Sequence, residues 1–165
     1  MINAGQKLDE KTLQLITYLV AKHSNASVTA IMKLCYLIDL IHHNKYKKQI
    51  SDFTYIRYHY GPFNNRVYSY LESLVNSGKS VESLAYSGFG DEYILYKPSD
   101  KDKDVMPTKV SAEEMETVVG VIDQVGAYGP AVLTKIAYGT KPLKSIGATL
   151  GGSEGIGREL DLSAK

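Results

Sequence analysis

The 165-residue sequence contains no tryptophan, three phenylalanines and one cysteine, Cys35. A single cysteine cannot form a disulfide within the chain, which excludes a disulfide-built scaffold and fits a reducing compartment. Cys35 lies in the most apolar run of the sequence, where a cysteine usually packs as a small hydrophobic side chain. We therefore expect no cysteine nucleophile.

The sequence also lacks a large excess of charge and any long apolar run. Its formal net charge is +1, which gives no electrostatic basis for a broad nucleic-acid or membrane surface. No run approaches the ~18 apolar residues of a membrane span, and the start of the sequence does not have the pattern of a signal peptide. We therefore expect a cytoplasmic protein without a membrane partner, folded as a single domain over residues 1–165.

Sequence motifs of catalysis and metal binding are missing as well. There is no G-x-S-x-G, H-E-x-x-H or C-x-x-C motif, and Gly78–Ser80 lacks the upstream glycine of a phosphate loop. The one cluster of metal-ligand types comprises Asp39, His42, His43 and His59. Neighbouring residues on a helix point about 100° apart, so His42 and His43 cannot easily face one metal ion. We expect no metal, no cofactor and no enzymatic activity.

What the sequence does contain is a helix, about residues 28–43, that is apolar almost all round and is therefore predicted to be buried at the centre of the fold. One wedge of about 120° is polar and carries Lys33, Tyr36, Asp39 and His43. Spacings of three and four residues bring these side chains into reach of one another. Asp39 and His43 could act as an acid–base pair. We favour a hydrogen-bonded network that orients the helix against the following strand.

The remaining patterns predict an α+β fold, mainly helical, with about five helices around a small antiparallel sheet. The other predicted helices begin at Asp9, after Pro62–Phe63, at a Ser111–Glu114 capping box and at Pro130. The predicted strands are Phe53–Tyr60, ended by a Gly61–Pro62 turn, and a hairpin of Val81–Tyr86 with Glu92–Lys97. A glycine-rich segment, about residues 147–157, is predicted to be flexible.

One sequence pattern also resembles a known family. It reads Lys33-Leu34-x-Tyr36-x-x-Asp39-x-x-His42, followed by Tyr46, Tyr60-Gly61-Pro62 and Tyr68, and it resembles the SocA-like, or Panacea, antitoxin domain. The resemblance is strongest over about residues 28–71, with a weaker match at Tyr128-Gly129, Leu133 and Pro142.

The resemblance implies a mainly helical, non-catalytic protein from a bacterial or phage toxin–antitoxin operon. Its implied partner is a cognate protein toxin, which it neutralises by direct binding. SocA-type members act as adaptors that deliver the toxin to a protease, so a protease is a second implied partner. Because the toxins of the family are diverse, the contact surface is expected to vary between members.

For that contact surface the sequence predicts one face of the 53–60 strand, with Tyr55, Arg57 and His59, together with the loop at 46–52. Tyrosine and arginine are favoured anchors of interfaces, although the thirteen tyrosines of the chain can equally fill the edges of a core. Partner binding and a structural role therefore both stay open for the candidate residues, which are Tyr36, Asp39, His42, His43, Tyr46, Tyr55, Arg57, His59, Tyr60, Gly61, Pro62 and Tyr68.

The alternative function is a DNA-binding transcriptional regulator. Residues 118–139 have the helix, short break and helix spacing of a helix-turn-helix. The second of these helices carries Lys135 as its only basic residue, whereas a recognition helix usually brings more cationic side chains to the phosphates. We therefore do not expect direct nucleic-acid binding.

Overall fold

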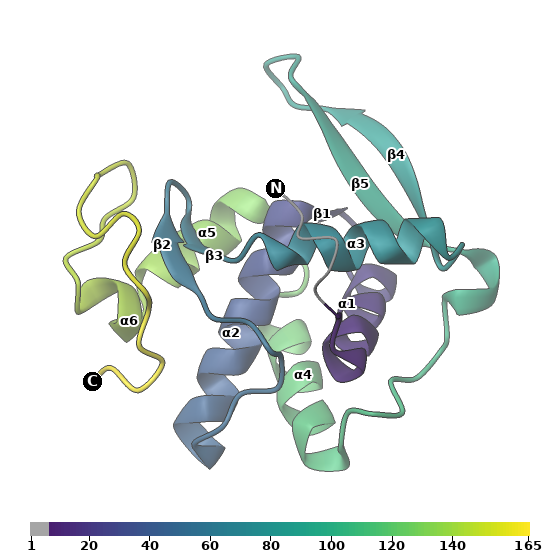
Figure 1. Ribbon diagram of the computed structural model, residues 1–165. Coiled ribbons are helices and arrows are strands. Elements are labelled where there is room, and N and C mark those ends of the chain that lie inside the picture. The colour runs from purple at the N-terminus through teal and green to yellow at the C-terminus, as the bar shows by residue number, and fades with distance from the viewer. Residues whose placement is uncertain (1–6) are drawn as a thin grey trace.

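The computed structural model describes residues 7–165, which form six α-helices and two small antiparallel sheets (Figure 1). The elements are α1 (Glu10–Lys22), β1 (Ala26–Ser27), α2 (Val28–Tyr46), β2 (Ile56–Tyr58), β3 (Gly61–Phe63), α3 (Arg66–Asn76), β4 (Ser80–Tyr86), β5 (Glu92–Pro98), α4 (Ala112–Val125), α5 (Pro130–Tyr138) and α6 (Lys141–Lys144). The predicted α+β, mainly helical class is confirmed. Residues 1–6 of the expected 1–165 domain lie outside the described residues.

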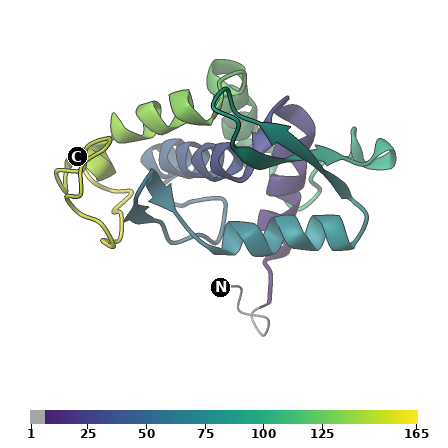
Figure 2. The ribbon, with the colours of Figure 1, turned by 90° about the horizontal axis from the view of Figure 1, so that it is seen from above.

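The predicted central helix is α2, and it is buried as expected. Every residue from Ala30 to Leu40 is buried, including the polar side chains of the wedge in that range. Figure 2 shows α2 between α5 on one side and α3 on the other, and α1 and α4 also contact it. The helix begins at a Ser27 N-cap, whose hydroxyl accepts the Ala30 N–H at 3.2 Å, and it ends three residues later than predicted.

Local signals at the helix N-termini place the starts of α1, α4 and α5 correctly. The Asp9 carboxylate accepts the Thr12 N–H at the start of α1, and the Ser111–Glu114 capping box opens α4. Pro130 occupies the first turn of α5. None of the helices described over residues 7–165 is long and apolar enough to span a lipid bilayer.

The predicted hairpin is formed by β4 and β5, which pair from Ser80↔Pro98 to Tyr86↔Glu92. It projects away from the helices toward the top of Figure 1. β1 pairs with the other side of β5, so that the sheet order is β1-β5-β4 and β4 is an edge strand. The sequence did not indicate β1, because two residues are too few to show a period.

The predicted strand over residues 53–60 is wrong in its extent. β2 covers only Ile56–Tyr58, and the chain reverses at His59 and Tyr60. Gly61 and Pro62, predicted as the turn, instead begin the returning strand β3, with Arg57 opposite Pro62. Gly61 has φ +95°, which an L side chain rarely adopts, so the glycine is what allows the chain to return directly after the turn.

The end of the chain packs beside β2. Gly157 N donates to Arg57 O at 2.7 Å, Arg57 N donates to Arg158 O at 2.8 Å, and Leu160 N donates to Tyr55 O at 2.9 Å. Residues 157–160 thus continue the hydrogen bonding of the small sheet on the side away from β3. The predicted flexibility of 147–157 stays a prediction, but its last residue is tied to the sheet.

Candidate functional site

Asp39 is the centre of a buried hydrogen-bond network. Its carboxylate accepts the backbone N–H groups of Ile50 and Ser51 at 2.9 and 3.0 Å, the Tyr55 hydroxyl at 2.7 Å, and the Ser51 hydroxyl. Burial raises the pKa of Asp39, and these four hydrogen bonds oppose the rise. The network holds the segment 50–55 against α2, as the favoured interpretation of the polar wedge predicted.

The other polar side chains of the wedge do not join this network. The Tyr36 hydroxyl lies 2.7 Å from Thr140 Oγ1, and burial raises the pKa of Tyr36 to about 12. His43 Nδ1 is buried without a hydrogen-bond partner among residues 7–165. No hydrogen bond joins Asp39 to His43 among the described residues, because the Asp39 oxygens are engaged by the segment that follows α2.

His42 and Tyr46 also have structural positions at the end of α2. His42 is fully buried, with Nδ1 2.8 Å from Thr117 Oγ1 of α4, and its ring lies 4.6 Å from the Tyr46 ring. Burial lowers the pKa of His42, which favours the neutral imidazole. His42 therefore joins α2 to α4.

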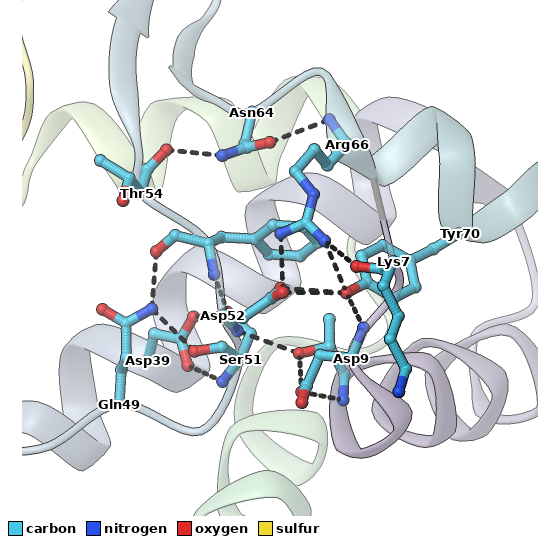
Figure 3. Close-up of polar contacts among 12 residues, drawn as sticks. Lys7, Asp9, Asp39, Gln49, Ser51, Asp52, Thr54, Asn64, Arg66 and Tyr70 are labelled. Atoms are coloured by element: carbon cyan, nitrogen blue, oxygen red, sulfur yellow. Dashed lines mark hydrogen bonds and ion pairs between the residues drawn. The ribbon is translucent and has the colours of Figure 1, made fainter. Parts of the chain in front are cut away.

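A second set of polar contacts fixes the segment after α2 to two helices (Figure 3). Asp52 forms an ion pair with Arg66 at 2.6 Å and accepts the Tyr70 hydroxyl at 3.1 Å. The same hydroxyl accepts the Asp9 N–H at 2.8 Å, so that the starts of α1 and α3 meet at Asp52. The loop at 46–52, predicted as part of a binding surface, is therefore pinned by Asp39 and Asp52, and its Ile50 is buried.

The binding face predicted for the 53–60 strand is not exposed at two of its three residues. Tyr55 is 2% exposed and Arg57 is fully buried, whereas His59 is exposed in the turn. The Arg57 guanidinium donates to the carbonyls of Tyr58, Thr149 (3.2 Å), Gly152 (2.7 Å) and Glu154 (3.2 Å), and it lies 5.2 Å from the centre of the Tyr138 ring. Apart from Tyr58, these partners lie about 80 to 97 residues away along the chain. The alternation of side chains within residues 53–60 therefore could not predict that a distant segment covers Arg57.

The opposite side of the β2–β3 hairpin borders a cleft of about 250 Å³. Residues of α2, the hairpin and α3 line it: Thr29, Met32, Lys33, Tyr58, His59, Tyr60, Gly61, Phe63 and Tyr68. Tyr58 and Tyr68 are each 42% exposed and Tyr60 is 71% exposed, so these tyrosines form the rim of the cleft. We call this surface the tyrosine cleft.

Lys33 forms the floor of the tyrosine cleft and is only 2% exposed. Its Nζ donates to the Pro62 carbonyl at 2.8 Å, and in the described part of the chain no carboxylate lies within ion-pair distance. Burial lowers the pKa of Lys33 from its ordinary 10.5 to about 8. A buried lysine without an acidic partner is uncommon in proteins.

The structure thus divides the candidate residues into two groups. His59, Tyr60, Gly61, Pro62 and Tyr68 gather at the tyrosine cleft, whereas the others lie at buried or half-buried positions elsewhere. Sequence reasoning placed neither Lys33 nor Tyr58 among the candidate site residues. The available signal for Lys33 was a single cation flanked by apolar residues in a helix predicted to be buried.

The helix-turn-helix alternative would place α5 as the recognition helix, and α5 carries little positive charge. Both α4 and α5 pack on α2. α5 buries Leu133 and Ala137 and leaves Lys135 as the only exposed basic side chain on this nine-residue helix. Among residues 7–165 there is also no group of three or more histidine, cysteine or acidic side chains that could hold a metal ion.

Comparison with known proteins assigns a family. A family model described as antitoxin SocA-like, Panacea domain, matches residues 31–142, from α2 through the tyrosine cleft and the β4–β5 hairpin into α6. No curated protein and no solved structure gave a significant match to the chain. The match covers more than half of the 165 residues, so the chain belongs to the SocA-like antitoxin family, which is defined by the Panacea domain.

Proposed function

We propose that this protein is a cytoplasmic antitoxin that neutralises a cognate protein toxin by direct binding, and that the toxin docks on the tyrosine cleft. Family membership supports the class of activity. The observation that supports the tyrosine cleft as the docking site is the exposure of Tyr58, Tyr60 and Tyr68 around a hollow in the surface. Tyrosine offers a large contact area and a hydroxyl group, and it is enriched among the residues that dominate interface energies.

Contacts within the chain support the hairpin that forms the rim of the cleft. Arg57 joins β2 to the segment at 149–152, and Gly61 packs beside α5, where a Cβ would make ordinary van der Waals contact with the Tyr138 ring at 3.4 Å. Lys33 fastens β3 to α2 through Pro62. A rim whose backbone is already ordered loses little conformational entropy on binding, which favours affinity.

A binding role also fits the way in which the polar side chains of the candidate set are used. Asp39 is engaged by the segment after α2, Arg57 by backbone carbonyls and His42 by Thr117. These groups stabilise the fold, so the proposal requires no reacting group.

The β4–β5 hairpin is the competing surface, because it also exposes apolar side chains. Its exposed large residues are Val81, Leu84, Tyr86, Phe89, Tyr93 and Ile94. The hairpin is a projecting arm, whereas the tyrosine cleft is concave and has a buried cation at its floor. We favour the cleft because residues that carry most of an interface's energy cluster where water is excluded.

The test is co-expression with the product of the neighbouring gene, scored by growth and by co-purification. Wild-type protein should rescue growth and form a complex. Tyr60→Ala should weaken the complex about tenfold or more, the range of an interface anchor, while Tyr86→Ala on the hairpin should leave it unchanged. The two tyrosines are a matched pair, since they are 71% and 63% exposed and neither change opens a core.

The outcomes separate the possible answers. A harmless neighbour and no complex would contradict the antitoxin role itself. If Tyr86→Ala abolishes the rescue of growth and Tyr60→Ala does not, the toxin contacts the β4–β5 hairpin instead of the tyrosine cleft. The toxin's half-life distinguishes two routes of neutralisation, because sequestration, which we propose, leaves it unchanged or longer, whereas delivery to a protease shortens it.

A further inference from the structure

The ammonium group of Lys33 is a buried cation whose charge is not matched within the described chain. It has three N–H donors, and the Pro62 carbonyl accepts one of them at 2.8 Å. A neutral carbonyl compensates a buried charge far less well than a carboxylate does. The lowered pKa, about 8, reflects this burial, and Lys33 still carries its charge at neutral pH.

The surroundings of Lys33 select the charge and the shape of a ligand. The titratable groups that face it across the cleft are Tyr58, His59 and Tyr60 of the hairpin and Tyr68 of α3, and no acidic side chain lines the cleft in the described chain. Met32 and Phe63 form an apolar part of the cleft wall. A complementary ligand therefore has a short apolar stem that ends in an anion, which describes the side chain of glutamate or aspartate.

We propose that the tyrosine cleft receives an acidic side chain of the bound toxin, and that its carboxylate pairs with the ammonium group of Lys33. The inference rests on the proposed function and adds the chemistry of the contact. A volume of about 250 Å³ suits one inserted side chain. The exposed tyrosines of the rim lie where the polypeptide around that side chain would pass, and a small free acid would leave them unused.

The pairing makes toxin binding depend on pH. A bound carboxylate stabilises the ammonium form, so the pKa of Lys33 rises in the complex. Between the free pKa, about 8, and the higher pKa of the complex, binding takes up a proton, and affinity falls by up to about tenfold per pH unit as pH rises. Below the pKa of Lys33 in the free protein, the titration of Lys33 does not change the affinity for the toxin.

The test measures the dissociation constant of the antitoxin–toxin complex at about pH 7 and about pH 9 for wild type, Lys33→Met and Lys135→Met. We expect wild type to weaken about tenfold at the higher pH. Lys33→Met keeps the length of the side chain and removes the charge, so it should bind about tenfold more weakly at neutral pH and lose the Lys33-dependent pH response. Lys135→Met removes a charge from the exposed side of α5 and should match wild type at both pH values.

A competition arm identifies the source of the carboxylate. Free glutarate, added as a millimolar probe, should compete only weakly, while replacing one acidic residue of the toxin by its amide should reproduce the effect of Lys33→Met. If Lys33→Met binds the toxin as tightly as wild type does, with the same pH profile, the inference is overturned and the antitoxin role stays intact. Glutarate binding to the cleft without any effect of Lys33→Met on the toxin would overturn it as well. Absence of any complex with wild type would overturn the proposed function.

Discussion

Lys33 and Arg57 are both buried cations near the β2–β3 hairpin, and the structure satisfies them in opposite ways. The guanidinium group of Arg57 donates to four backbone carbonyls, so most of its N–H donors have hydrogen-bond partners. Among residues 7–165, the ammonium group of Lys33 has a single hydrogen-bond partner, the Pro62 carbonyl, and it borders the tyrosine cleft. We interpret Arg57 as a structural residue and Lys33 as a binding residue.

Burial of Lys33 predicts a specific pH dependence of stability. Because the folded-state pKa is about 8 and the unfolded value is 10.5, the unfolded chain binds more protons between these pH values. The destabilisation caused by Lys33 is therefore complete below about pH 8 and is relieved as pH rises toward 10.5, by about 3 kcal/mol in total.

Urea unfolding of wild type and Lys33→Met across this pH range measures the effect. The free energy of unfolding of wild type should rise relative to that of the variant as pH increases. Tyr36 and Tyr70, whose pKa values burial raises to about 12, are present in both proteins, so their titration cancels in the difference. If the difference in free energy of unfolding between the two proteins stays constant with pH, burial of the Lys33 ammonium group does not destabilise the fold.

At the scale of elements, the sequence predicted what local pattern controls. The burial of α2, the caps at Asp9 and Ser111 and the β4–β5 hairpin all follow from periods and capping signals within a few residues. The candidate site was predicted less well. The covering of Arg57 depends on contacts across more than 90 residues of chain, which no local signal encodes. The tyrosine cleft was missed for the same reason, since α2, the hairpin and α3 build it together.

The contacts of Arg57 predict that this side chain orders the end of the chain. Arg57→Lys should increase hydrogen exchange at the Gly157 and Leu160 amides about tenfold or more, because one ammonium group cannot bridge the carbonyls of Thr149, Gly152 and Glu154.

Arg158→Lys is the matched control for that experiment. Arg158 lies in the same segment, but it is exposed. Equal exchange in the two variants would mean that backbone pairing alone orders this segment, and that the guanidinium contacts of Arg57 contribute little.

At the scale of the whole molecule, positive and negative charges are nearly balanced. The net charge is +1, so broad electrostatic attraction contributes little to binding. The β2–β3 turn and the β4–β5 hairpin both point toward the top of Figure 1. Toxin affinity should therefore depend only modestly on salt, as expected for tyrosine contacts with one buried ion pair.

The most direct measurement is a hydrogen-exchange footprint of wild-type protein, free and bound to the toxin. The account predicts that binding slows exchange in the hairpin residues 56–63 and at the start of α3, around Tyr68, where the cleft is built. Protection confined to β4 and β5, residues 80–98, with none at the tyrosine cleft, would contradict the account.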